Sequence, residues 1–180
     1  MINVFDVYRQ NFYIDFDSLD SIEVTKKEFQ TYSVKAGDIV FVRSSLKLEG
    51  VGVEGVGASA CVPSLSEPII FECHLVKLRA SYKIIPEYLI NYLNSSVVRQ
   101  RLIALANTVT MTTIGQTALT NLEVEIPPVS EQQAIVEFLK NETAKIDELI
   151  IKIETQNEKL KEYRQSLISN VVTGKVRVVE

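Results

Sequence analysis

The chain has 180 residues, of which 46% are hydrophobic, and its formal net charge at pH 7 is −4. The hydrophobic content is sufficient for a folded core and excludes a disordered chain. No apolar run approaches the roughly 18 residues that a membrane helix needs, and residues 1–6 show no signal-peptide pattern, so we expect a cytoplasmic protein with no membrane contact. The mildly acidic balance lacks the basic excess of a general nucleic-acid binder, so DNA binding would require local clustering of charge or a basic partner.

Two strands are predicted in the first half of the chain. Residues 38–42 form a short run of β-branched and aromatic side chains after Gly37, which is typical of a buried strand. Residues 69–79 form a second run, with alternation in its latter half. The glycine-rich stretch 50–57 lies between them and predicts a turn or a hairpin. The first 30 residues are compatible with strands or with a loop-rich edge.

Four further elements are predicted before residue 128. Pro86 suits the first position of a helix, and the tripeptide Asn-Ser-Ser at 94–96 separates two helical segments and caps the second. Threonine dominates the stretch that follows, which indicates a polar loop, and Pro127 ends a segment of strand-like alternation. In chain order these elements are a helix over 87–93, a helix over 97–106, a polar loop over 107–118 and a strand over 122–126.

Motifs for catalysis and for cofactor binding lead to no site. Residues 50–55 match the GxGxxG dinucleotide pattern, but the residues after them are poor helix formers, and the motif needs a helix N-terminus to bind the pyrophosphate. The only histidine, His74, cannot form a zinc-binding pair, and neither Cys61 nor Cys73 lies in a metal-ligand pattern. We therefore predict no catalytic residue, no cofactor and no metal.

Residues 130–174 are predicted to form one uninterrupted helix. Two prolines stop the preceding segment, and Ser130 with Gln133 has the spacing of a capping box. No proline or glycine follows until Gly174, which suits a left-handed C-terminal cap. At about 1.5 Å per residue the helix is roughly 60 Å long, about twice the diameter of a domain of ~130 residues. Part of it should therefore contact another helix, in this chain or in a second one.

An apolar stripe with a seven-residue period runs along this helix and is its predicted pairing face. With Leu139 at position a of the heptad, alternate d positions are polar (Glu142, Gln156 and Asn170), so the pairing is not of maximal stability. Such residues either fix the register and the partner or, near the helix ends, lie beyond the paired section. We expect a helix-to-helix contact through this stripe, whose predicted pairing residues are Leu139, Ile146, Leu149, Ile153, Leu160, Tyr163 and Leu167.

These patterns predict an α+β fold. Residues 1–128 should form a small mixed α/β domain, residues 129–174 a long coiled-coil helix, and residues 175–180 a short C-terminal tail. The chain has room for one ordinary domain in addition to the helix.

Four segments, taken in order, resemble one protein family. They are KAGDIVFVRSS at 35–45, PEYLINYLNS at 86–95, IPPVSEQQAI at 126–135 and LISNVVTGKV at 167–176. Together with the long helix, they resemble the specificity subunit of type I restriction-modification systems. The resemblance extends from about residue 28 to the C-terminus.

The resemblance implies a non-catalytic subunit whose globular part, residues 1–128, is a target recognition domain that reads one half of a bipartite DNA sequence. The long helix would pair with a second such helix and dock the methyltransferase subunit, through which the restriction subunit joins. The full subunit of the family has two domains and two helices, and the segment that normally opens the domain is missing before Met1. We therefore expect either a half-size subunit that dimerises or a fragment of a longer one.

The candidate contacts to double-stranded DNA lie on two predicted loops. Arginine can bond guanine through two hydrogen bonds, serine can bond a base or a phosphate, and lysine reaches phosphate. The first loop carries Arg43, Ser44, Ser45 and Lys47, and the threonine-rich loop carries Thr110 and Thr112. Ordinary solvated loops have the same composition. The alternative function is a homodimeric coiled-coil adaptor, or a truncated subunit, that binds the methyltransferase subunit without binding DNA.

Overall fold

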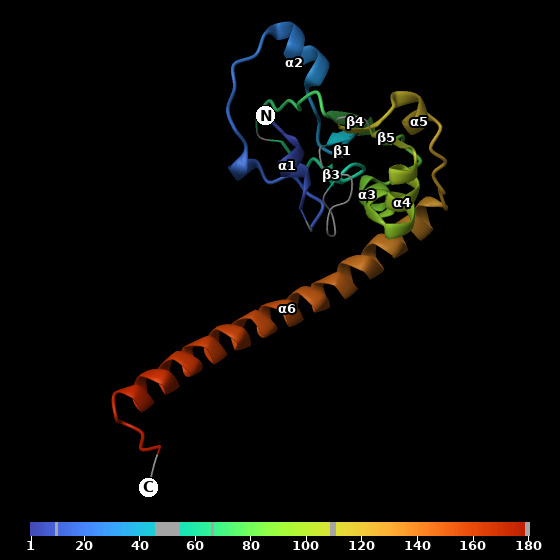
Figure 1. The fold of residues 1–180 in the computed structure, drawn as a ribbon. Helices are drawn as coiled ribbons and strands as arrows, with labels where there is room; N and C mark the ends of the chain where they lie inside the picture. Colours follow the sequence, from blue (N-terminus) through green and yellow to red (C-terminus); the bar gives the residue numbers. More distant parts are fainter. Residues whose placement is uncertain (10, 46–54, 66, 109–110, 179–180) are drawn as a thin grey trace. The chain divides into compact units, whose positions relative to one another are not determined.

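The computed structural model describes residues 1–9, 11–45, 55–65, 67–108 and 111–178 (Figure 1). It divides into two compact units, Met1–Val136 and Glu137–Glu180. The first unit contains short helices and two three-stranded sheets, and a single long helix, α6, dominates the second. The predicted α+β class with a long C-terminal helix is confirmed. Within the described ranges, no helix combines the length and the apolar character that a membrane crossing needs.

The first sheet is antiparallel and has the strand order β3-β1-β4. The central strand is β1 (Asp38–Val42), with β3 (Ser59–Cys61) on one side and β4 (Leu75–Arg79) on the other. All five residues of β1 are buried, which explains why its sequence is a continuous run and not an alternation. The predicted strand 38–42 is confirmed. The predicted strand 69–79 is regular only from Leu75, because a turn at 73–74 precedes it.

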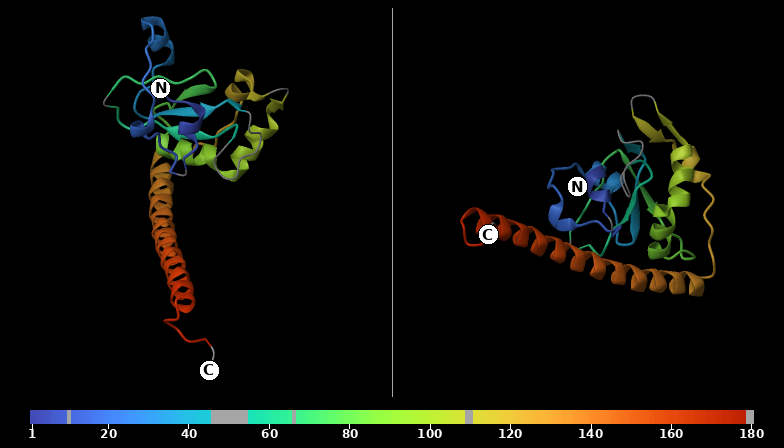
Figure 2. Two further views of the ribbon diagram at one scale, coloured as in Figure 1. Left: turned by 60° about the vertical axis from the view of Figure 1, so that its left-hand side comes forward. Right: turned by 60° about the horizontal axis from the view of Figure 1, so that its bottom comes forward.

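The two faces of β1 contribute to two separate hydrophobic clusters. Val40 and Val42 belong to the first cluster, which the N-terminal segment completes, whereas Ile39 and Phe41 belong to the second. Successive side chains of a strand point to opposite faces, so the assignment alternates. Figure 2 shows the N-terminal segment (blue) on one side of the sheet and the yellow-green helices α3 and α4 on the other.

Helices α3 (Pro86–Asn94) and α4 (Ser96–Ala104) cover the second cluster. Pro86 occupies the start of α3, as predicted, since its fixed φ and missing N–H suit that position. The predicted cap between the helices is different in detail, because the Ser95 hydroxyl donates to the Tyr92 carbonyl oxygen at 2.8 Å and makes no cap bond to α4. Helix α4 ends at Ala104, two residues earlier than predicted, and the chain then enters a strand.

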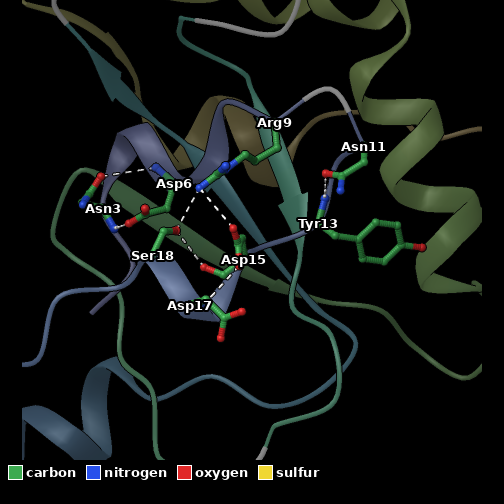
Figure 3. Close-up of polar contacts among 8 residues, drawn as sticks. All are labelled: Asn3, Asp6, Arg9, Asn11, Tyr13, Asp15, Asp17 and Ser18. Carbon is green, nitrogen blue, oxygen red and sulfur yellow. Dashed lines mark hydrogen bonds and ion pairs between the residues drawn. The ribbon is translucent and has the colours of Figure 1, made fainter. Parts of the chain in front are cut away.

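The first 20 residues fold through local polar motifs (Figure 3). In α1 (Val4–Val7), Asn3 and Asp6 form a capping box, in which each side chain accepts a hydrogen bond from the backbone of the other. Arg9 donates to the Ser18 hydroxyl at 2.8 Å, next to the short helix η1 (Phe16–Ser18). A second capping box, between Thr25 and Glu28, opens α2 (Lys26–Tyr32), which has no buried residue and packs on the first cluster through the partly buried Tyr32. Because these motifs have no hydrophobic period, the sequence pattern left this region ambiguous.

A second antiparallel sheet, with the order β2-β6-β5, replaces the polar loop predicted over 107–118. Its strands are β2 (Ser44–Ser45), β6 (Thr112–Ile114) and β5 (Ala106–Thr108), and α5 (Gln116–Thr120) follows. Threonine is β-branched and suits a pleated strand as well as a loop, so composition alone led to the wrong prediction.

The strand predicted over 122–126 is also wrong, because these residues pair with no described strand. Leu122 and Val124 nevertheless pack against the second cluster, which accounts for the alternation of apolar and polar residues. The Tyr88 hydroxyl donates to the Glu125 carbonyl oxygen at 2.9 Å and holds the extended segment against α3.

Helix α6 (Val129–Val172) has 44 residues, which corresponds to roughly 66 Å. It begins one residue before Ser130, so Ser130 lies in the first turn and the predicted capping box is wrong; the N–H groups of Glu131 and Gln132 donate to the Pro128 carbonyl oxygen. The predicted C-terminal cap is confirmed, because Gly174 has a φ of 75° and the Lys175 N–H donates back to the Asn170 carbonyl oxygen. The predicted domain boundary after residue 128 stays a prediction; the two compact units meet inside α6, after Val136.

Gln132 is the one buried residue among the described side chains of α6. Its Oε1 accepts from the Ile85 N–H at 2.9 Å, and its Nε2 donates to the carbonyl oxygens of Lys83 and Pro127 at 2.9 and 2.8 Å. All three partners belong to the first unit. The side chain therefore holds the first turn of α6 against the entry of α3 through hydrogen bonds to backbone groups.

Gln132→Ala should lower the free energy of unfolding by about 1–3 kcal/mol, because it leaves the Ile85 N–H and two carbonyl oxygens without their partner. Urea unfolding at neutral pH measures the loss. The matched control is Gln133→Ala, since Gln133 is the same residue type at an exposed position of the same turn. Equal stability of the two variants would contradict the assignment.

Asp38 begins β1 with a carboxylate that is only 2% exposed. It accepts two hydrogen bonds from Arg79, both of 2.6 Å, and one from the Lys35 N–H at 2.7 Å. Burial raises the pKa of Asp38, but these hydrogen bonds outweigh it, and the net pKa lies below the ordinary value of 3.8.

Asp38→Asn should lower stability by about 1–3 kcal/mol at neutral pH, since it removes a charged acceptor. Because folding lowers the pKa of Asp38, its contribution is complete above pH 3.8 and is lost as the pH falls through the lower folded value. The gap between wild type and variant should therefore narrow in this acidic range, as measured by urea unfolding at several pH values. Glu142→Gln, which removes the exposed ion pair with Lys145, should change stability little at any pH.

Candidate nucleic-acid interface

Strands β1 and β2 belong to one stretch of chain that a β-bulge interrupts at Arg43 and Ser44. The backbone N–H groups of both residues donate to the His74 carbonyl oxygen, at 3.0 and 3.3 Å, so two residues of one strand oppose one residue of its neighbour. Before the bulge, Val42 pairs with Leu75 of the first sheet; after it, Ser44 pairs with Thr113 of the second. The bulge therefore transfers the strand from one sheet to the other.

Arg43 lies at this transfer point, and its backbone is held on both sides. Its carbonyl oxygen accepts from the Ile114 N–H at 2.8 Å, in addition to the bond of its own N–H to His74. The side chain is half-buried, and its Nε is buried without a hydrogen-bond partner in the described part of the chain. Because Nε is buried, a ligand would have to bond the terminal NH groups of this half-buried guanidinium.

The predicted contacts Ser44, Ser45 and Thr112 lie in strands, and not in the loops that the sequence predicted. The two serines are each 7% exposed and Thr112 is 2% exposed. The hydroxyl of Ser44 is 2.8 Å from that of Thr113, and the hydroxyl of Ser45 is 3.1 Å from that of Tyr8. In this arrangement the serines support the more exposed Thr113 and Tyr8; their own contact with DNA stays a prediction.

The structure brings residues of the two predicted loops together on adjacent strands. Ser45 pairs directly with Thr112 across β2 and β6, although they lie far apart in sequence. The other two predicted contacts, Lys47 and Thr110, lie outside the described residues.

Sequence analysis missed three residues near these strands. Tyr8 reaches Ser45 from α1, and Asn107 lies on β5 directly opposite Thr113. Arg99 of α4 is buried next to Gly57, where desolvation lowers the pKa of its guanidinium and the nearby Tyr8 opposes that shift. Tyr8 and Arg99 lie near these strands only because of the tertiary fold. Asn107 was missed because its segment was predicted to be a loop.

Comparison with known proteins identifies the family. The type I restriction modification DNA specificity domain matches residues 5–162. The chain belongs to this family. It is 27% identical over 168 residues to the type I restriction enzyme EcoKI specificity subunit of Escherichia coli (strain K12), and 28% identical over 166 residues to the StySPI specificity subunit of Salmonella potsdam. These alignments cover 89% and 88% of this chain but only 34% and 33% of the relatives. The chain therefore spans about a third of the length of these relatives.

Solved structures support the same fold. A structure that describes the complex assembly and conformational transition of the type I R-M system matches 77% of this chain and 31% of its own, with a TM-score of 0.60 and 19% identity. The HsdS subunit from Thermoanaerobacter tengcongensis matches 80% of this chain and 31% of its own, with a TM-score of 0.52 and 19% identity. The resemblance seen in the sequence to type I specificity subunits is thereby confirmed.

Proposed function

We propose that the chain is a non-catalytic DNA-recognition subunit of a type I restriction-modification complex, and that its globular unit reads one half of a bipartite target. The family match over residues 5–162 carries this proposal, because both curated relatives are named specificity subunits of type I restriction enzymes. The partners are double-stranded DNA, a methyltransferase subunit and, through it, a restriction subunit.

The surface at β2 and β6 is the proposed DNA contact. Arg43 supplies a half-buried guanidinium at a bulge whose backbone is held by three hydrogen bonds. Arginine with this degree of support is suited to bond the O6 and N7 of guanine. The net charge of −4 gives no general attraction to phosphate, so long-range attraction to DNA falls to the partner subunits.

The exposed apolar stripe of α6 supports pairing with a second long helix. Six of the seven predicted pairing residues are exposed in the single chain: Ile146, Leu149, Ile153, Leu160, Tyr163 and Leu167. Leu139 is half-buried. A stripe of this length is costly in water, and pairing with a copy of itself would bury it. A homodimer would carry two recognition domains, which matches a bipartite target.

The adaptor without DNA binding remains the second candidate, because the serines and Thr112 are buried and the chain is acidic. A gel shift with random duplexes, with and without the methyltransferase subunit, separates the two functions. A shift that requires the present chain supports DNA recognition. A stable complex of the two proteins that shifts no duplex supports the adaptor.

Ile153→Glu combined with Leu160→Glu should convert the homodimer to a monomer, because two buried charges in the seam cost several kcal/mol. Sedimentation equilibrium measures the mass. Thr155→Glu combined with Gln165→Glu adds the same charge to other faces of α6 and should leave the mass of the dimer unchanged. A dimer that survives the first pair of substitutions would show that the stripe is not the interface.

Arg43→Ala should weaken binding to the preferred sequence by about 1–3 kcal/mol and relax discrimination at one base pair. Affinity for the preferred and a scrambled duplex, measured at two salt concentrations in the assembled complex, tests this. Arg101→Ala removes an exposed arginine of α4 and is the control for charge alone. A uniform loss on all sequences, with a salt slope lower by about one unit, would instead assign Arg43 to phosphate.

A further inference from the structure

The second sheet has one face in the core and one face toward solvent. Along β6, Thr112 and Ile114 are buried while Thr113 between them is half-buried, as the two-residue period of a strand requires. Ile114 belongs to the second hydrophobic cluster, so its face is the inner one. Thr113 therefore lies on the outer face.

A row of three polar residues crosses this outer face, one from each strand. Ser44 and Asn107 are both directly opposite Thr113, on β2 and β5 respectively. Directly opposed residues of antiparallel strands share a face, with Cβ atoms about 4.5–5.5 Å apart. Exposure increases along the row, from the buried Ser44 through the half-buried Thr113 to the exposed Asn107.

The residues of this row differ in whether their side chains already take part in a hydrogen bond. The hydroxyls of Ser44 and Thr113 are 2.8 Å apart and bond each other, which fixes the position of Thr113. The carboxamide of Asn107 makes no hydrogen bond within the described ranges. Asparagine is also depleted in strands, where it contributes less to pairing than a β-branched residue. The presence of Asn107 in β5 therefore points to a role other than strand stability.

We infer that Asn107 reads an adenine of the DNA target. An asparagine carboxamide accepts a hydrogen bond from the N6 amino group of adenine and donates one to N7, a pair that no other base offers in the major groove. Asn107 lies on a paired strand beside the fixed Thr113, so its backbone is positioned before binding. The inference rests on the proposed DNA recognition and adds to it a second specificity residue, on a different strand from Arg43.

The test selects preferred sequences from random duplexes with the chain assembled with its methyltransferase subunit. Asn107→Thr is the informative variant, because threonine maintains strand propensity while it removes the carboxamide. We expect it to lose the preference for adenine at one position by about 10–100-fold, with the other positions unchanged. Asn121→Ala removes an exposed asparagine from the turn after α5 and should select the wild-type sequence.

A modified base gives the second arm of the test. Replacing adenine by 7-deazaadenine at that position removes the N7 acceptor, so it should weaken wild-type binding and leave the affinity of Asn107→Thr unchanged. An unaltered preference in Asn107→Thr, or an equal loss on every sequence, would overturn the inference and leave the proposed recognition of DNA in place. If the wild-type complex selects no sequence at all, the proposed function and the inference both fail.

Discussion

The complete burial of β1 is the constraint on which the rest of the globular unit depends. Its four apolar side chains alternate between two hydrophobic clusters, so the N-terminal segment on one face and α3 with α4 on the other pack on the same strand. The strand is also anchored at its start, where Asp38 binds Arg79 and the Lys35 N–H. Because both faces of β1 are buried, a segment exposed to solvent can begin only beyond the end of this strand.

That end is where the proposed recognition surface begins. The bulge at Arg43 allows a buried strand to continue into a second sheet whose outer face is polar. A bulge bends the strand and increases its local twist, which is why a core element and a surface element can be consecutive in sequence. The proposed DNA contacts are thereby mounted directly on the most buried part of the fold, and a rigid mounting favours discrimination between bases.

The two ends of α6 differ in how their side chains are buried. Its first turn is held through the buried Gln132, whose amide satisfies three backbone groups of the first unit. From Glu137 onward, its apolar stripe lies almost entirely exposed in the single chain. A polar anchor at one end and an uncovered apolar stripe beyond it are consistent with the proposed pairing of α6 with a second long helix.

The sequence was sufficient to predict the elements whose conformation is determined by residues close to one another along the chain. The length of α6 and the cap at Gly174 beyond its end followed from helical periodicity, breakers and left-handed glycine geometry, and β1 and α3 followed from their composition. The capping box at the start of α6 was not formed, because Ser130 lies within the first turn and not before it. The family, too, could be inferred from motif order.

Only the tertiary structure decided the second sheet and, with it, the candidate site. Ser44 and Thr113 are separated by 69 positions, and neither short strand carries enough residues to show a period of its own. Strand pairing depends on a partner elsewhere in the chain, so composition could not distinguish a polar strand from a polar loop. The same reason explains why Tyr8 was missed: its role arises from a contact with Ser45 that no local pattern encodes.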